Sequence, residues 1–235
     1  MKILALESSA TACSAALCED EKLIAQTFQN SGLTHSRTLM PMVDSLLTQC
    51  GQTMDDVDVV AVAAGPGSFT GLRIGVSTAK GLAWAGEKPC APCSTLESMA
   101  WQLAHMDGII ISAMDARRSQ VYNAVFRAEN GRLERLSPDR AIGLVDLEEE
   151  LKKLSGPKIL VGDGAQLCYN EWQERMDDLR LAPIHLRWQT AWGVARAALE
   201  LARKDGLVPG EALAPVYHRL SQAERERLEK EQNKQ

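Results

Sequence analysis

The sequence predicts an α/β fold of two lobes, each formed by a mixed β-sheet with flanking helices. Each half of the chain begins with short apolar runs separated by polar turns, which is typical of a strand meander. Each half then continues with apolar strands that alternate with amphipathic helices. Because 235 residues suffice for one large domain or two small lobes, we assign residues 1–106 and 107–220 to the lobes and 221–235 to a charged tail.

Short apolar runs between turn residues predict the strands of the first half, which are residues 3–6, 13–18, 23–28, 57–64 and 88–93. Apolar residues that recur on one face predict its helices, which are residues 36–50, 70–86 and 95–105. Gly51 stands at the C-terminal end of the first helix and Pro41 lies near its first turn. Glycine is favoured just after the end of a helix, and proline is tolerated in its first turn.

The pattern restarts after Asp107-Gly108. The predicted strands of the second half are residues 109–114, 120–127, 132–136 and 158–161, with a hairpin turn at 129–131. The predicted helices are residues 146–154, 167–176 and 190–204. Two lobes of this plan that face each other form the architecture of the actin-like, RNase H-like fold.

The composition indicates a globular protein without a membrane segment. Hydrophobic residues make up 45% of the chain, which supports a sizeable core, and no apolar run reaches bilayer length. The formal net charge of −5 argues against an independent nucleic-acid binder. Met1-Lys2 leads straight into a strand, without the pattern of a secretory signal. The six cysteines lie among small apolar residues rather than in a disulfide framework, so we expect a cytoplasmic protein.

A glycine-rich stretch at residues 65–75 separates a predicted buried strand from a predicted helix. Backbone amides at such a helix start suit an anion, so a phosphate cradle is one interpretation. The phosphate motifs do not fit, because Thr70 stands where a dinucleotide fingerprint needs glycine and the Gly-Lys-Ser/Thr of a P-loop is absent. Small residues also recur every fourth position from Gly71 to Ala83. This stripe packs either against the chain's own core or against a partner.

Cysteine and histidine residues offer few sites for redox or metal chemistry. Cys90-Ala91-Pro92-Cys93 has the spacing of a thiol–disulfide exchange motif, and the alternative is that both cysteines fill a strand end. No further ligands at zinc spacing accompany them. No two of the four histidines stand four residues apart, so no helix carries a two-histidine metal face. His35 precedes a helix and suits a cap or a partner contact.

Glu7 and Asp115 end the first strands of the two predicted lobes. Actin-like ATPases carry Asp-x-Gly at these strand ends, where the carboxylate holds a metal–nucleotide and the glycine admits phosphate. The sequences here are Glu7-Ser8-Ser9 and Asp115-Ala116-Arg117, so the glycine is missing from both. We expect each carboxylate to cap a turn. We also expect Asp115, Arg117 and Tyr122 to form an ion-pair and hydroxyl cluster.

Four segments together resemble the TsaB (YeaZ) family, namely residues 3–9, residues 65–75, Asp115-Ala116-Arg117 with Tyr122, and residues 215–219. The match runs in order through the whole chain, and the glycine-rich block is its most specific part. This family is similar to TsaD, the enzyme that places a threonylcarbamoyl group on the adenosine beside the anticodon of tRNA. The resemblance implies the actin-like fold and a non-catalytic partner role.

The resemblance also locates a difference from the enzyme. TsaD carries a His-x-x-x-His metal pair after its own glycine-rich helix, whereas Thr95 and Met99 hold the corresponding positions here and only Glu97 is kept. Neither threonine nor methionine replaces imidazole at a metal bound by nitrogen and oxygen. The resemblance therefore implies no catalytic residue, and no metal or cofactor bound by this chain alone. It leaves ATP or ADP to the assembled complex.

The resemblance implies that the glycine-rich helix pairs with TsaD or, in its absence, with a second copy of the chain, and that TsaE docks on the assembled pair. We therefore expect the partner interface at Gly71, Leu72, Arg73, Gly75, Val76, Ala79 and His35. The acidic balance makes direct tRNA binding unexpected. Two alternatives use the cleft between the lobes. An actin-like ATPase or sugar kinase is disfavoured by the missing Asp-x-Gly loops, and a metallopeptidase lacks a metal pair or an activated nucleophile.

Overall fold

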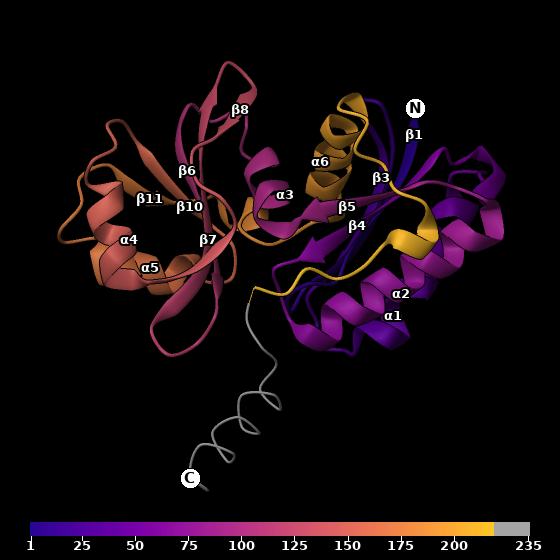
Figure 1. Cartoon of the computed structure of the whole chain (residues 1–235), viewed down its shortest axis with the longest axis horizontal. Helices are drawn as coiled ribbons and strands as arrows, with labels where there is room; N and C mark the ends of the chain where they lie inside the picture. Colours follow the sequence, from indigo (N-terminus) through magenta and orange to yellow (C-terminus); the bar gives the residue numbers. More distant parts are fainter. Residues whose placement is uncertain (219–235) are drawn as a thin grey trace, which may run out of the picture.

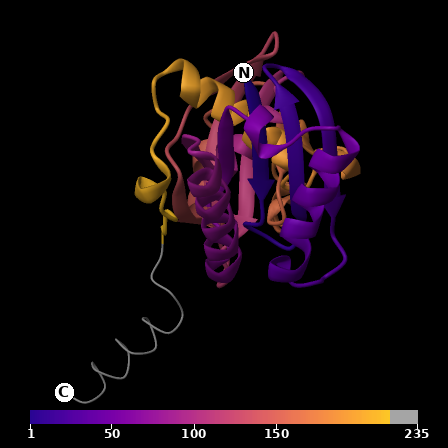
Figure 2. The ribbon, with the colours of Figure 1, turned by 90° about the vertical axis from the view of Figure 1, so that its right-hand side faces the viewer.

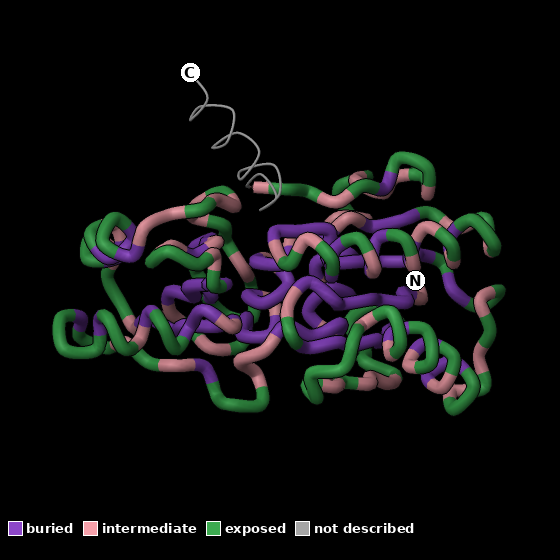
Figure 3. Tube along the Cα trace, turned by 90° about the horizontal axis from the view of Figure 1, so that it is seen from below, coloured by how far each residue is buried: buried purple, intermediate pink, exposed green. Residues whose placement is uncertain are grey.

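The computed structural model describes residues 1–218 and consists of two lobes that lie side by side (Figure 1). The predicted two-lobe α/β architecture is therefore confirmed. Each lobe has a mixed β-sheet that combines an antiparallel meander with parallel strands. Buried strands run through the interior, and helices and loops supply most of the exposed surface, as the purple and green segments of Figure 3 show. The predicted tail at 221–235 lies outside the described residues.

The sheet of the first lobe has five strands in the order β3-β2-β1-β4-β5. Their bounds are β1 Lys2–Glu7, β2 Cys13–Glu19, β3 Lys22–Gln29, β4 Val59–Gly65 and β5 Cys90–Ser94. β1 and β4 are almost wholly buried, which explains their continuous apolar sequences. Because β1 and β4 pair in parallel, the end of β1 at Glu7 lies at the same edge as the glycine-rich loop that follows β4.

The sheet of the second lobe has the order β11-β10-β6-β7-β8, with β9 paired to β7. The bounds are β6 Gly108–Asp115, β7 Gln120–Glu129, β8 Arg132–Arg135, β9 Arg140–Gly143, β10 Lys158–Val161 and β11 Leu179–Leu181. Asn130 and Gly131 have positive φ, as the predicted hairpin turn between β7 and β8 requires. The sequence does not predict β9 and β11, because strands of 4 and 3 residues show no clear alternation.

Helices cover both faces of the first sheet. Their bounds, with those of the second lobe, are α1 His35–Gln49, α2 Phe69–Gly86, α3 Thr95–Trp101, α4 Leu144–Leu151, α5 Ala165–Trp172 and α6 Ala191–Arg203. α1 and α2 pack on one face through residues such as Leu39, Val43 and Val76. α6 packs on the other face through its alanines. α3 contacts the sheets of both lobes and lies between them in Figure 1.

The position of α6 corrects the predicted boundary of the second lobe. The prediction assigns residues 107–220 to that lobe, but α6 packs against β1, β2 and β5 of the first sheet. Residues 207–218, which we call the strap, also return to the first lobe. The Val216 amide donates to the Ala64 carbonyl oxygen at 2.7 Å, and Figure 2 shows the gold strap beside α2. Local periodicity predicts the helix but not the distant sheet that it covers.

Candidate functional site

A cleft of about 550 Å³ opens between the two lobes. Its walls come from the turn after β1, the glycine-rich loop before α2, the turn after β6 and the loop after β10, and the end of the strap lies at its mouth. An actin-like ATPase or kinase would use this cleft for its nucleotide. The loops that line it therefore decide which chemistry the chain can perform.

The turn after β1 is bound to the N-terminus of α2 by the chain's own atoms. The Ser8 hydroxyl donates to the Gly71 carbonyl oxygen at 2.9 Å, and the Ser68 amide donates to the Ser9 carbonyl oxygen at 2.6 Å. The Ser68 hydroxyl accepts from the Gly71 amide, as an N-cap residue does. A Cβ at position 71 would lie 2.1 Å from the Ser8 carbonyl oxygen, so only glycine fits there. The Ser68 and Gly71 amides are thus satisfied within the chain.

Glu7 is fully buried behind this turn. Its Oε1 accepts from the Ser9 amide at 2.6 Å, which confirms the predicted turn cap, whereas its Oε2 has no hydrogen-bond partner among the described residues. Burial raises the pKa of Glu7 to about 7, the hydrogen bonds from Ser9 oppose this rise, and the charge of Asp163 adds to it. Glu7 is not among the residues that line the cleft, so its carboxyl does not face a ligand there.

The turn after β6 has the same carboxylate contact but faces solvent. Asp115 Oδ1 accepts from the Arg117 amide at 2.6 Å, so Asp115 also caps its turn as predicted. Within residues 1–218, Asp115 makes no ion pair with the Arg117 side chain, so that part of the predicted cluster is wrong. Arg117, Arg118 and Ser119 are exposed and have φ of 63°, 57° and 54°, in the left-handed region.

Two backbone amides and two carboxylates shape the wall of the cleft. The Ser68 amide donates to the Ser9 carbonyl oxygen and the Gly71 amide to the Ser68 hydroxyl, and the carboxylates of Asp115 and Asp163 line the cleft and add negative charge to it. Gln189 Nε2 donates to Asp163 at 2.8 Å, and burial raises the pKa of Asp163. In the part of the chain that the structure describes, no group of three or more His, Cys, Asp or Glu residues could hold a metal ion.

The two positions that correspond to the transferase histidines hold core side chains. Thr95 and Met99 are fully buried on α3, and Met99 belongs to the apolar cluster between α3 and the second sheet. A Cβ at Gly162 would lie 2.9 Å from the Met99 sulfur. The space between α3 and the loop after β10 is therefore filled by the chain's own atoms rather than by ligands for a metal.

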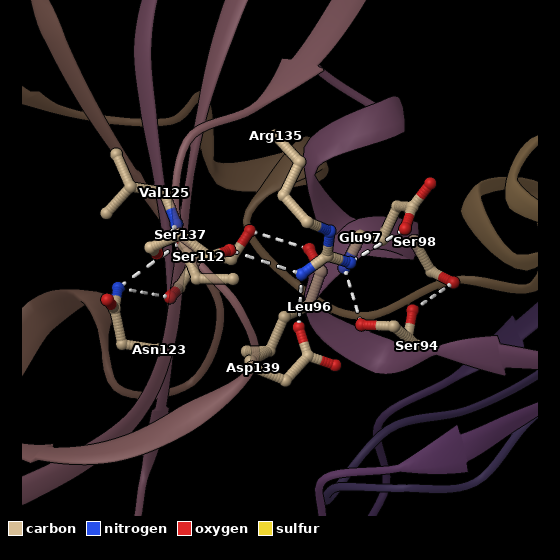
Figure 4. Close-up of polar contacts among 11 residues, drawn as sticks. Ser94, Leu96, Glu97, Ser98, Ser112, Asn123, Val125, Arg135, Ser137 and Asp139 are labelled. Atoms are coloured by element: carbon tan, nitrogen blue, oxygen red, sulfur yellow. Dashed lines mark hydrogen bonds and ion pairs between the residues drawn. The ribbon is translucent and has the colours of Figure 1, made fainter.

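Glu97, the acidic residue of α3, binds the second lobe. Figure 4 shows Arg135 of β8 reaching α3, where its Nη2 donates to Glu97 Oε2 at 2.7 Å. Its Nη1 donates to Asp139 Oδ1 at 2.6 Å. The Ser112 hydroxyl of β6 adds a hydrogen bond to the Leu96 carbonyl oxygen at 2.7 Å. These contacts hold the second lobe against α3.

The strap is bound to α2 at the mouth of the cleft by one aromatic cluster. The rings of Phe69 and Tyr217 stack with their centroids 4.5 Å apart. The Arg73 guanidinium carbon lies 3.9 Å from the Phe69 centroid, and Arg73 Nε donates to the Tyr217 hydroxyl at 3.1 Å. Exposed Arg73 therefore links the outer face of α2 to the rim of the cleft.

Most residues of the predicted partner interface lie on the buried face of α2, so this prediction is largely wrong about which face is exposed. The following residues of that prediction are buried within the chain: Gly71, Leu72, Gly75, Val76 and Ala79. A Cβ at Gly75 would lie 2.4 Å from the Ser8 hydroxyl oxygen. The alternative interpretation of the stripe, an internal contact of the helix with its own lobe, is therefore confirmed. The sequence reveals the stripe but not what covers it.

Arg73 and His35 are the remaining residues of the predicted interface, and both reach the surface at least in part. His35 begins α1, and its Nε2 lies 2.7 Å from the Ala10 carbonyl oxygen. This contact ties α1 to the turn after β1. His35 thus has a structural role in the isolated chain, whether or not it also contacts a partner.

The solvent-facing side of α2 carries a second stripe of small residues that the sequence analysis does not single out. Ser77, Gly81 and Ala85 are exposed at every fourth position, and Trp84 beside them has 85% of its surface exposed. A Cβ at Gly81 would meet nothing within 4 Å. The recurrence of small residues at every fourth position could have revealed this stripe too. Spacing alone does not tell which of the two stripes faces solvent.

The cysteines of the CxxC segment are packing residues. Cys90 and Cys93 are buried in β5, and burial raises the pKa of both thiols. A buried thiol with a raised pKa is unreactive. The interpretation of these cysteines as filling a strand end is confirmed, and the thiol–disulfide exchange interpretation is wrong.

The fold and the cleft define an actin-like protein in which the turn after β1 packs against the start of α2. A family model described as TsaD, tRNA N6-adenosine threonylcarbamoyltransferase, matches residues 28–165. The chain is 40% identical to the Bacillus subtilis tRNA threonylcarbamoyladenosine biosynthesis protein TsaB over 71% of this chain and 73% of that protein. It is 33% identical to Escherichia coli TsaB over 93% and 95% of the two chains. The chain belongs to the TsaB family.

Solved structures agree with this assignment. A Pseudomonas aeruginosa protein described as similar to the peptidase YeaZ matches with a TM-score of 0.74 and 25% identity, over 93% of this chain and 99% of that chain. YeaZ from the same organism matches with a TM-score of 0.73 and 25% identity, over 92% and 99% of the two chains. Within residues 1–218, no helix combines the length and apolar character needed to cross a bilayer.

Proposed function

We propose that this chain acts in the formation of threonylcarbamoyladenosine in tRNA, as a non-catalytic partner subunit that binds and stabilises a TsaD-type transferase. Relatives named for this biosynthesis support the pathway, and the match to the transferase model supports a common fold for the two partners. The proposal places the chain in the cytoplasm. It assigns no direct tRNA contact to the chain, whose net charge is −5.

The contacts that the chain makes with itself at the cleft carry the proposal. The Ser68 amide already donates to the Ser9 carbonyl oxygen, and the carboxylates of Asp115 and Asp163 face the space that phosphates would need. Buried Thr95 and Met99 replace the two histidines of the transferase. A chain that lacks the groups to hold phosphate or metal contributes by binding a partner rather than by chemistry.

The proposed partner surface is the exposed face of α2 together with the neighbouring face of α1. A glycine inside an exposed helix is about 1 kcal/mol less favourable than alanine, and nothing in the chain needs the space at Gly81. A partner helix that approaches closely would need it. On α1, Met40 adds an apolar side chain that is 44% exposed. In the absence of the transferase, a second copy of the chain uses the same surface.

Binding of this chain to the transferase of the same organism tests the proposal directly. Gly81→Trp should weaken this binding at least tenfold in calorimetry, because the indole fills the proposed interface. Folding should not suffer, since the new side chain meets solvent in the isolated chain and tryptophan has a higher helix propensity than glycine. Val145→Trp is the matched control, because Val145 is 71% exposed on α4 of the other lobe. Unchanged binding of the Gly81 variant would contradict the placement of the surface.

A reconstitution separates the partner role from catalysis. The proposal expects TsaE to join the pair of this chain and the transferase, with ATP or ADP bound at the assembled complex. Modification of a tRNA transcript should then require all three proteins. Omission of this chain should abolish the modification, whereas Asp115→Asn in this chain should leave it intact. A transferase that works equally well without the chain would overturn the proposed role.

A further inference from the structure

Arg73 stands on the same exposed stripe of α2 as the small residues of the proposed partner surface. It lies four residues before Ser77, and Gly81 and Ala85 follow at the same spacing, with all four residues exposed. Residues four apart lie above one another on a helix, so Arg73 is the first member of this stripe, near the N-terminal end of α2. A protein that packs along the whole stripe therefore also meets Arg73.

Two aromatic side chains hold the Arg73 guanidinium in one orientation. Its central carbon lies 3.9 Å from the Phe69 centroid, and its Nε donates to the Tyr217 hydroxyl at 3.1 Å. The rings of Phe69 and Tyr217 stack on each other, and the backbone hydrogen bond from Val216 to Ala64 fixes the strap beside them. A side chain that is already fixed loses less conformational entropy when a partner binds, so this arrangement suits an interface.

The outer edge of this guanidinium is free. Within residues 1–218, Nε is the only nitrogen of the Arg73 side chain that makes a hydrogen bond, so Nη1 and Nη2 keep their donors. No acidic side chain in this part of the chain forms an ion pair with Arg73, whereas Arg203, which is also exposed, pairs with both Glu21 and Glu200. A guanidinium with a free edge binds a carboxylate through two parallel hydrogen bonds.

The charge of α2 is positive although the chain as a whole is acidic. Arg73 and Lys80 are the only charged side chains of α2, which contains no Asp or Glu, while the chain has a net charge of −5. Lys80 is partly buried and its Nζ donates to the Glu211 carbonyl oxygen at 3.2 Å. The carboxylates of Glu87 and Glu211 line a pocket beside the C-terminal half of α2, and Arg73 does not line that pocket. The N-terminal half of the stripe therefore favours a negatively charged group on the partner.

We propose that Arg73 determines the specificity of the partner surface by binding an aspartate or glutamate side chain of the transferase, an inference that rests on the proposed function. Nη1 and Nη2 donate to the two carboxylate oxygens, while Phe69 and Tyr217 keep the guanidinium in place. The strap takes part in recognition, because it supplies Tyr217, which is itself 41% exposed. Lysine does not replace Arg73, because an ammonium group lacks the planar fork that matches a carboxylate.

Calorimetric titration with the transferase of the same organism, at low and at high salt, tests this inference. At low salt, Arg73→Glu should raise the Kd by about thirtyfold or more and Arg73→Lys by about fivefold. High salt should weaken the binding of the unchanged chain more than that of Arg73→Lys or Arg73→Glu. Arg180→Glu is the matched control, because Arg180 is exposed on β11 of the other lobe and has no acidic partner within residues 1–218. This control should change the Kd by less than about twofold.

Tyr217→Phe tests the fixed orientation of the guanidinium separately. It removes the hydroxyl that accepts from Arg73 and keeps the ring, so it should raise the Kd by about threefold in the unchanged chain and have no further effect in Arg73→Lys. Circular dichroism checks that each variant is folded, and glutamate and lysine both have a helix propensity close to that of arginine.

The outcomes separate this inference from the proposed function. If the unchanged chain and Arg73→Glu bind the transferase equally well, the inference fails and the partner role stands. If the unchanged chain does not bind the transferase, both fail. If Arg73→Glu weakens only the self-association of the chain, measured by sedimentation, the carboxylate belongs to a second copy and the inference fails.

Discussion

In both lobes a carboxylate at a strand end caps the turn that follows it, yet only in the first lobe is that carboxylate buried. Glu7 ends β1 and Asp115 ends β6, and each carboxylate accepts from the amide two residues later at 2.6 Å. Glu7 is fully buried and Asp115 is exposed. The difference comes from what packs over each turn, because the N-terminus of α2 lies directly on Ser8 and Ser9, which are buried.

This comparison explains why we expect the cleft to bind no nucleotide although the actin-like fold is kept. The first lobe uses its glycine-rich loop for internal packing, so Gly71 serves close approach to Ser8 instead of close approach of a phosphate. The second lobe keeps an open turn with a carboxylate. We expect the packing of the first lobe's loop alone to prevent nucleotide binding, because such a site uses the loops of both lobes.

The largest expected effect on stability is at the contact between α2 and the turn after β1. Gly71→Ala should lower the free energy of unfolding by about 3 kcal/mol or more, because its Cβ would lie 2.1 Å from a backbone oxygen that cannot rotate away. Urea unfolding measures the loss. Gly81→Ala on the same helix is the control and should stabilise the chain by roughly 0.5–1 kcal/mol. Equal effects of the two changes would contradict the close contact between α2 and the first turn.

The second expected effect is a pH dependence of stability that arises from Glu7. The pKa of Glu7 is about 7 in the folded chain, against an ordinary value of 4.5. The favourable contribution of Glu7 to the free energy of unfolding is therefore fully present below about pH 4.5 and is lost as pH rises through 7. Between pH 4 and pH 8, the stability of Glu7→Gln relative to the unchanged protein should therefore rise by roughly 2–3 kcal/mol. Urea unfolding across this range measures the difference.

Glu149→Gln is the matched control for this pH experiment. Glu149 is exposed on α4, and a hydrogen bond from Lys152 lowers its pKa. Its contribution is therefore present above the ordinary pKa and is lost as pH falls, which is the opposite direction to Glu7. A flat difference between the unchanged protein and Glu7→Gln would show that Glu7 is not buried in solution.

A smaller effect is expected at the joint that holds the two lobes together. Arg135→Gln removes the hydrogen bonds to Glu97 and Asp139 and should lower the free energy of unfolding by about 1 kcal/mol, since the guanidinium is only partly buried. Hydrogen exchange of amides in α3 and β8 should rise with it. Arg127→Gln, which breaks only an exposed pair with Glu134, should change neither quantity measurably.

The smallest effect is expected at the open turn. Arg118 has φ of 57°, a conformation that is unfavourable for a residue with a Cβ. Arg118→Gly should therefore stabilise the chain by about 0.5 kcal/mol, after the entropy that glycine adds to the unfolded chain is subtracted. Thermal unfolding would detect a rise in Tm. A fall in Tm would mean that the left-handed turn is not the conformation in solution.

Features set by local periodicity are predictable from this sequence. The helix expected at 36–50 is found at His35–Gln49, and Gly51 follows it with φ of 62°. The turn caps at Glu7 and Asp115 are also predictable, because a short carboxylate at a strand end readily accepts from nearby amides. The absence of Asp-x-Gly at both strand ends predicts a cleft that does not bind phosphate, and this stays a prediction.

Features that depend on what covers an element are not predictable in this way. Two stripes of small residues run along α2, and only the fold shows that Gly75 is buried while Gly81 is exposed. The return of α6 to the first sheet and the reach of Arg135 to α3 join residues far apart in sequence. Periodicity carries no information about such distant pairs.

Calorimetric titration of the isolated chain with MgATP tests the central claim most directly. The account predicts no saturable heat at millimolar nucleotide, because the Ser68 and Gly71 amides already donate to oxygens of Ser9 and Ser68 and neither strand end carries the glycine of Asp-x-Gly. Saturable binding by the chain alone with a micromolar Kd, abolished by a bulky residue in the cleft such as Thr11→Trp, would contradict it.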